Sequence, residues 1–143
     1  MALQRIRLNS NALLEAVALH RPDLLHLAAS AYGSPSLLWA GETTLASAKG
    51  VQQGDPLGPL FFCLTLDSAL KSLDAEFLAG YLDDVSLGDT IPHLIGQIWT
   101  LEVAAAAIGL QLNRTKCEIV GLDPSQREVW RVLRLELHGN RGR

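Results

Sequence analysis

Two adjacent carboxylates, Asp83 and Asp84, are the side chains of this sequence best suited to chemistry. They follow an apolar run at residues 77–82 that is typical of a buried strand, and residues 85–88 can return beside it. The sequence therefore predicts a hairpin whose two-residue tip holds both acids. Charges beside a buried strand are costly unless a cation or a basic partner neutralises them, so the pair is a candidate metal site. Because neighbouring strand positions face opposite sides, we expect one acid to act and the other to support it.

An ordinary polar turn is the alternative explanation of this pair. Asp is among the residues that turns favour, and two adjacent Asp residues taken alone are more often a turn than a metal site. The surrounding elements must therefore decide between the two explanations.

The segment before the hairpin is a shaped loop followed by an apolar helix. Residues 50–59 include three Gly and two Pro, which excludes a regular helix or strand. Gly54 allows a ligand to approach the backbone closely, and Pro59 suits the first turn of a helix. We expect that helix to run from Leu60 to about Leu73, with its first half buried under the sheet that carries Asp83. A plain turn into the helix is the alternative reading of the loop.

The rest of the chain alternates between helical and extended patterns. Helix signals place a first helix after Asn9 or Ser10, a second between Asp23 and Gly33, and a long third one between Asp89 or Thr90 and Gly109. Extended patterns predict a hairpin turning at residues 41–42 and short strands at residues 110–113 and 117–120. Helix and strand cannot be separated for residues 126–137.

Three sequence blocks, taken in order, resemble the reverse transcriptases of non-LTR retrotransposons. They are residues 50–59 (GVQQGDPLGP), 81–84 (YLDD) and 109–118 (GLQLNRTKCE), and the resemblance covers roughly residues 11–120. It implies an α+β fold, with a polymerase-palm-like antiparallel sheet and packed helices. It also implies a partial palm domain at residues 1–121, followed by an unassigned extension with a basic tail at residues 122–143. The chain is too short to include also the fingers and thumb that family members use to hold template and primer.

The resemblance also implies roles for single residues. Asp83 and Asp84 would be catalytic and would bind Mg²⁺ or Mn²⁺, and Lys116 would protonate the departing pyrophosphate or steady the nucleotide phosphates. Residues Gln53, Gly54 and Tyr81 would bind substrate. The implied partners are an RNA template, a DNA primer and a deoxynucleoside triphosphate. For Lys116, a solvated side chain beside Glu118 is an equal alternative.

The composition is that of one globular domain outside the membrane. The chain has 143 residues, 48% of them hydrophobic and 19% charged. It has neither a long apolar span nor a signal-peptide pattern, so we expect a soluble intracellular protein. Cys63 and Cys117 lie too far apart in sequence, and too far from any His, to indicate a zinc site. The sequence leaves the oligomeric state open.

The charge distribution and the acidic residues argue against an independent polymerase. The formal net charge is −3: residues 1–125 hold seven Lys/Arg and thirteen Asp/Glu, and the positive excess is confined to residues 126–143. Nucleic-acid binding usually needs a basic face. Two-metal nucleotidyl transfer also needs carboxylates from at least two strands, yet residues 1–10 contain no acid, and on the family pattern the second Asp would fall at or before Met1. Asp55, Asp67 and Asp89 are possible substitutes, although each suits a loop or a helix cap.

Two hypotheses follow. In the first, the chain is a reverse transcriptase domain for RNA-templated DNA synthesis by two-metal nucleotidyl transfer, truncated at its first catalytic strand and inactive alone. In the second, it is a non-catalytic remnant or interaction module that keeps the palm scaffold. Whether the chain alone is an enzyme is left open. A metal-dependent hydrolase built on Asp83 and Asp84 is disfavoured because no His or third acid completes its site.

Overall fold

The computed structural model describes residues 2–4, 8–47, 50–51 and 54–120. Helices and strands are mixed along this part of the chain, as the α+β prediction requires. The strands form one four-stranded sheet and one separate two-stranded hairpin.

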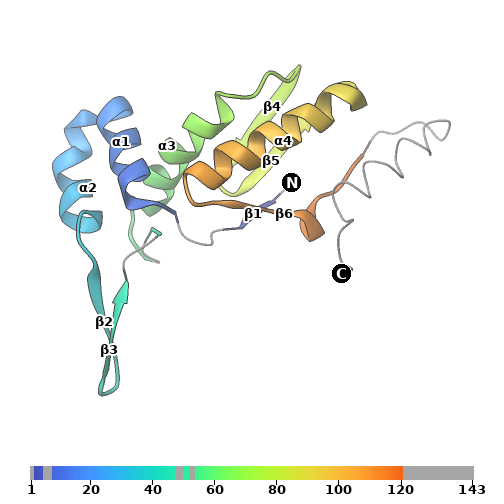
Figure 1. Cartoon of the computed structure of the whole chain (residues 1–143). Helices are drawn as coiled ribbons and strands as arrows, with labels where there is room; N and C mark the ends of the chain where they lie inside the picture. The colour runs from blue at the N-terminus through green and yellow to red at the C-terminus, as the bar shows by residue number, and fades with distance from the viewer. Residues whose placement is uncertain (1, 5–7, 48–49, 52–53, 121–143) are drawn as a thin grey trace.

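The larger sheet is antiparallel throughout and has the strand order β4-β5-β1-β6. Its strands are β1 (Ala2–Gln4), β4 (Phe77–Tyr81), β5 (Asp84–Gly88) and β6 (Gln111–Asn113). Two helices, α3 (Gly58–Leu70) and α4 (Ile91–Ala107), lie against this sheet (Figure 1). They bury its helix-facing side in a common core that includes Phe62, Leu66, Val85, Leu101 and Ala105. Helix α3 starts at Gly58 and ends at Leu70, not at Leu60 and about Leu73. The predicted burial of its first half holds for one face only, because Pro59 and Cys63 are exposed.

The opposite face of β4 and β5 is open. Tyr81 is 78% exposed and Phe77 is 57% exposed, and Ala79, Asp84 and Ser86 are also exposed. An antiparallel sheet with one packed and one solvated face is stable because side chains alternate between the two faces.

Helix α1 (Ser10–His20) packs on α3, and α2 (Leu25–Tyr32) packs on α1 and reaches α3 through the contact of Tyr32 with Phe61. Helix α1 begins after Asn9, whose side-chain oxygen accepts a hydrogen bond from the Asn11 backbone N–H (3.0 Å), so the predicted cap is confirmed. Pro22 starts a 3-10 turn, η1 (Pro22–Leu24), and α2 follows. The prediction that Asp23 caps this helix is wrong, because its carboxylate is bound by Arg21 instead.

The predicted hairpin around Gly41 is confirmed. Strand β2 (Ser36–Ala40) pairs with β3 (Thr43–Ser47), and Gly41 turns the chain with φ +64°. This hairpin projects away from the helices (Figure 1).

Helix α4 ends where predicted, at Gly109, with φ +82°. The N–H of Gly109 donates to the Ala106 carbonyl and that of Leu110 to the Ala105 carbonyl, which closes the last turn in a Schellman arrangement. The chain is thereby turned directly into β6.

The predicted strand at residues 117–120 is wrong. A 3-10 turn, η2 (Arg114–Lys116), follows β6, and the Cys117 N–H still bonds back to the Arg114 carbonyl. Val120 is 87% exposed, and no described strand pairs with residues 117–120. Gln53 and residues 121–143, including the predicted extension, lie outside the described part of the chain. No helix in the part of the chain that the structure describes is long and apolar enough to cross a membrane.

Candidate functional site

The hairpin that carries the two acids is present, but its turn lies one residue earlier than predicted. Tyr81 pairs with Asp84, so the two turn residues are Leu82 and Asp83, and Asp84 begins β5. The prediction that both acids occupy the tip is therefore wrong for Asp84, because strand pairing continues to that residue.

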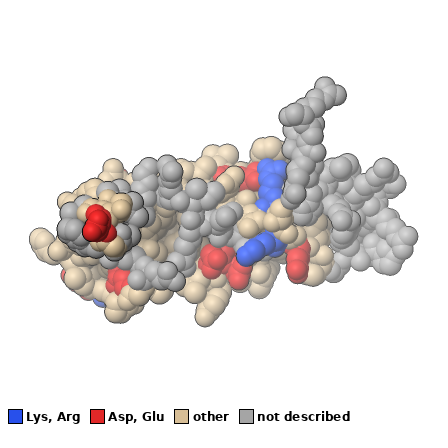
Figure 2. Space-filling model, turned by 90° about the horizontal axis from the view of Figure 1, so that it is seen from below, with Lys and Arg blue, Asp and Glu red and all other residues tan. Residues whose placement is uncertain are grey.

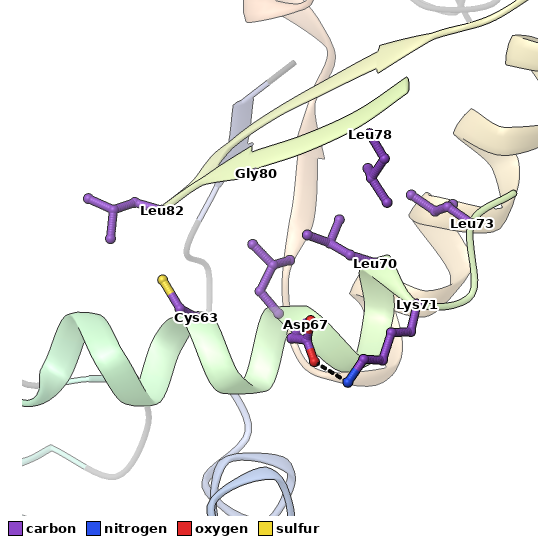
Figure 3. A pocket seen from close by; sticks show the side chains of 9 residues that line it. Cys63, Asp67, Leu70, Lys71, Leu73, Leu78, Gly80 and Leu82 are labelled. Atoms are coloured by element: carbon purple, nitrogen blue, oxygen red, sulfur yellow. Dashed lines mark ion pairs between the residues drawn. The ribbon is translucent and has the colours of Figure 1, made fainter. Parts of the chain in front are cut away.

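The backbone of this turn is unusual at Leu82. Leu82 has φ +51° and is the one non-glycine residue with positive φ among those described. Bulky side chains rarely adopt this conformation, and surrounding contacts must hold it in place. Leu82 lines a cavity of about 430 Å³ with Cys63, Leu66 and Leu70 of α3 (Figure 3). Leu82 thus borders the cavity between the hairpin and α3, next to the turn that presents Asp83.

The strand register places Asp84 in a row of paired residues across the sheet and leaves Asp83 in the turn. Asp84 pairs with Tyr81 on one side and with Ala2 of β1 on the other, and Ala2 in turn pairs with Asn113 of β6. Residues directly opposite in a sheet share a face, so this row lies on the open face. Asp84 is exposed there, whereas Asp83 is half-buried at the turn. Asn113 could not be found from the sequence, since its place depends on long-range strand pairing.

The loop before α3 is fixed by Asp55. One carboxylate oxygen accepts the Leu57 N–H (2.9 Å) and the other accepts the hydroxyl of Tyr32. The Tyr32 ring meets Phe61 edge-on, with centroids 5.9 Å apart. Asp55 is thus occupied in shaping the loop. Of the two predicted substrate residues here, Gly54 is exposed with φ +92°, and Gln53 is not described.

Asp67 and Asp89 are also engaged elsewhere. The Asp67 carboxylate lies 2.6 Å from the Lys71 ammonium, just past the end of α3, and 3.7 Å from His20 Nε2 of α1. Asp89 Oδ2 lies 2.7 Å from His93 Nδ1 and accepts the Glu76 N–H, while its Oδ1 accepts the Thr90 N–H. In the described ranges, no three His, Cys, Asp or Glu side chains cluster closely enough to hold a metal ion.

The two basic side chains after β6, Arg114 and Lys116, have different surroundings. The Arg114 guanidinium makes a double hydrogen bond to the Glu102 carboxylate of α4, both contacts being 2.8 Å. Lys116 is exposed on η2 and has no ion pair with any described acid. Arg114 therefore anchors the segment that presents Lys116. The pairing with Glu102 has no sequence signal, since the two residues are twelve positions apart in different elements.

Acidic and basic side chains are intermingled on the lower face of the molecule. Figure 2 shows red and blue groups side by side there, with no continuous basic stripe among the described residues. The described residues of this face therefore do not form the basic surface that nucleic-acid-binding proteins usually present to phosphate.

Comparisons with known proteins agree on one family. The family model described as "Reverse transcriptase (RNA-dependent DNA polymerase)" matches residues 11–133. The chain is 33% identical over 102 residues, 64% of its length, to a Retrovirus-related Pol polyprotein from type-1 retrotransposable element R2 of Nasonia vitripennis. It is 31% identical over 106 residues, 66% of its length, to the Pol polyprotein from type-2 retrotransposable element R2DM of Drosophila melanogaster. The chain spans about a tenth of the length of each relative. No solved structure matches the chain.

Proposed function

Because this chain belongs to the reverse transcriptase (RNA-dependent DNA polymerase) family, we propose that its β4–β5 hairpin is the acidic hairpin of an RNA-templated DNA polymerase site. The proposal assigns the sheet and its helices to the palm of such an enzyme. The observation that carries it is the position of Asp84 on the open, solvated face of a sheet whose other face is buried by α3 and α4.

Asp83 and Asp84 would supply carboxylate oxygens to Mg²⁺ or Mn²⁺. Oxygen donors of this kind suit both ions, but the described residues do not complete a set of three ligands. When bound, such a cation supplies the positive charge that neutralises triphosphate oxygens and activates a primer hydroxyl. We expect the chain alone to bind Mg²⁺ weakly, with a dissociation constant of about 1 mM or higher, because Mg²⁺ keeps most of its waters when few ligands are offered.

The other site residues are assigned by the same proposal. Tyr81 lies beside Asp84 on the open face, where its ring is available to a nucleotide or a base pair. Lys116 carries an ammonium group not engaged by a described acid, which can neutralise or protonate a phosphate oxygen. Gln53 and Gly54 would contact the incoming nucleotide through the loop that Asp55 shapes.

We propose further that this chain alone does not polymerise DNA. Among the described residues, one acidic hairpin does not offer enough carboxylates to hold two metal ions in the geometry that nucleotidyl transfer needs, and the charges on the face in Figure 2 are too mixed to hold a duplex in place. Further polypeptide, carrying at least one more carboxylate, would complete the site.

The metal–nucleotide part of the proposal is tested by paramagnetic broadening. Mn²⁺ with a deoxynucleoside triphosphate should selectively broaden the backbone amide NMR signals of residues 81–85. The double variant Asp83→Asn, Asp84→Asn should lose the effect. Glu76→Gln is the matched control, because it removes an exposed acid near the far end of β4 and should leave the broadening intact. Equal broadening in the double variant would contradict the assignment.

A further inference from the structure

Strand β4 is an uncovered edge of the main sheet. It is the first strand in the order β4-β5-β1-β6, and no described strand lies beyond it. In a hairpin closed by two residues, the pair flanking the turn exchanges hydrogen bonds, and alternate residues direct their N–H and C=O groups to the other side. Tyr81 and Asp84 flank the turn, so the backbone N–H and C=O groups of Tyr81 point to β5. Those of Gly80 and Leu78 therefore point to the open edge.

The edge lacks the usual protection against strand addition. Natural edge strands carry charges, Pro or bulges that block pairing with another chain. β4 reads Phe-Leu-Ala-Gly-Tyr, with no charge and no Pro, and its pairing with β5 is regular along all five residues. Phe77 and Tyr81 expose large aromatic side chains on its open face. Such an edge favours a strand partner that is itself uncharged and aromatic.

We propose that this partner is the β4 strand of a second copy of the chain, paired antiparallel about a two-fold axis at Ala79. In this register Phe77 of each copy lies opposite Tyr81 of the other, and Leu78 lies opposite Gly80 of the other. The two aromatic pairs fall at positions without hydrogen bonds, where opposed side chains are closest. The interface is self-complementary, as a two-fold contact must be.

The side facing the helices fits the same register. The cavity of about 430 Å³ opens beside Gly80 and is lined by Leu70, Leu73 and Leu82 (Figure 3). The Leu70 side chain already fills the space over Gly80, because its Cδ1 would lie 3.0 Å from a Cβ at that position. The Leu78 side chain of the second copy can therefore pack beside Leu70, at the mouth of the cavity. One strand and one cavity form a small contact, below about 1,200 Å², so association should be reversible and concentration-dependent.

Charge at Ala79 tests the register directly. Ala79 is exposed and lies opposite itself in the proposed dimer, so Ala79→Lys or Ala79→Glu alone sets like charges against each other. Each variant should weaken self-association, measured by sedimentation velocity over a concentration series, by at least about tenfold. An equimolar mixture of the two variants should associate again. Ser86→Lys, on the same open face but on β5, is the matched control and should associate like the unchanged chain.

A second measurement does not depend on charge. In a background with Cys63→Ser, which removes the exposed native thiol, Ala79→Cys should form a disulfide-linked dimer on mild oxidation, since opposed positions without hydrogen bonds are about 4.5 Å apart. A chain that stays monomeric at all concentrations, or a mixture of the charge variants that does not associate, would overturn the proposal. None of these variants changes Asp83, Asp84 or Tyr81, so this outcome is independent of the proposed function.

Discussion

The buried contact between Tyr32 and Asp55 links α2 to the loop before α3. The Tyr32 hydroxyl donates to a carboxylate that also caps the backbone at Leu57. Tyr32→Phe keeps the edge-on contact with Phe61 but removes this donor, so we predict a loss of about 1–2 kcal/mol in unfolding free energy by urea titration. Tyr81→Phe, at a highly exposed ring, should change it by less than about 0.5 kcal/mol. Equal effects of the two substitutions would show that the hydroxyl contact does not contribute.

Asp89 gives the chain a defined acid sensitivity. Burial alone would raise the pKa of Asp89, but hydrogen bonds from His93 and from the backbone N–H groups of Thr90 and Glu76 outweigh it, so the pKa is lowered. An acid whose pKa is lower in the folded state stabilises the fold above its unfolded value of about 3.9 and loses this effect as the pH falls through the folded value. We predict that unfolding free energy falls between about pH 5 and pH 3, and that Asp89→Asn removes part of this fall.

Asp23 is the control for that experiment. Its pKa is also lowered, first by the hydrogen bond from Arg21, but both side chains are exposed and the pair is screened by solvent. Asp23→Asn should therefore leave the pH dependence nearly unchanged. A profile for Asp89→Asn that parallels the unchanged chain would refute the role given to Asp89.

Among the helices, two glycines should respond in opposite ways to substitution by Ala: Gly33 at the end of α2 and Gly96 within α4. A Cβ at Gly33 would lie 2.4 Å from the Ala29 carbonyl oxygen, a backbone atom that cannot move without opening the end of α2. At Gly96, within α4, the same Cβ would meet nothing within 4 Å. We predict that Gly33→Ala destabilises the chain by about 1–3 kcal/mol and that Gly96→Ala stabilises it by about 0.5–1 kcal/mol. Thermal unfolding of both variants decides this, and a stabilised Gly33→Ala would contradict the described end of α2.

Local chemistry explains which elements could be predicted from the sequence. The Asn9 cap, the Gly109 stop and the Gly41 turn each depend on neighbouring residues, and each was confirmed. Long-range pairing explains what could not. The turn consists of Leu82 and Asp83, one residue earlier than predicted, because Asp84 pairs with both β4 and β1. Strand β1 comes from the other end of the chain, so this pairing has no local sequence signal.

The same reason applies to the site. The hairpin and its acids could be identified from the sequence because they are contiguous. The position of Asp84 on the open face, and of Asp83 in the turn, depends on the strand register. The row of paired residues from Tyr81 to Asn113 joins three segments that are distant in the sequence. The roles of Asp83, Asp84 and Lys116 and the domain boundary at residue 121 stay predictions.

For the whole molecule, the proposed polymerase function would require metal, template and primer to be held at the same time. The described residues offer one acidic hairpin, and the charges on the face in Figure 2 are intermingled. Losing a metal-bridging carboxylate removes most of the charge stabilisation of the transition state, and poor positioning multiplies that loss. We therefore predict that the chain carries part of a polymerase site without completing it.

Primer extension on an RNA template is the most direct measurement of this claim. The purified full chain is incubated with a DNA primer, the four deoxynucleoside triphosphates and either Mg²⁺ or Mn²⁺, beside the variant Asp83→Ala. We expect no template-dependent extension above the level of that variant with either ion. Extension that depends on the template and disappears in Asp83→Ala would contradict this expectation, since the chain or two copies of it would then supply every ligand that the reaction needs.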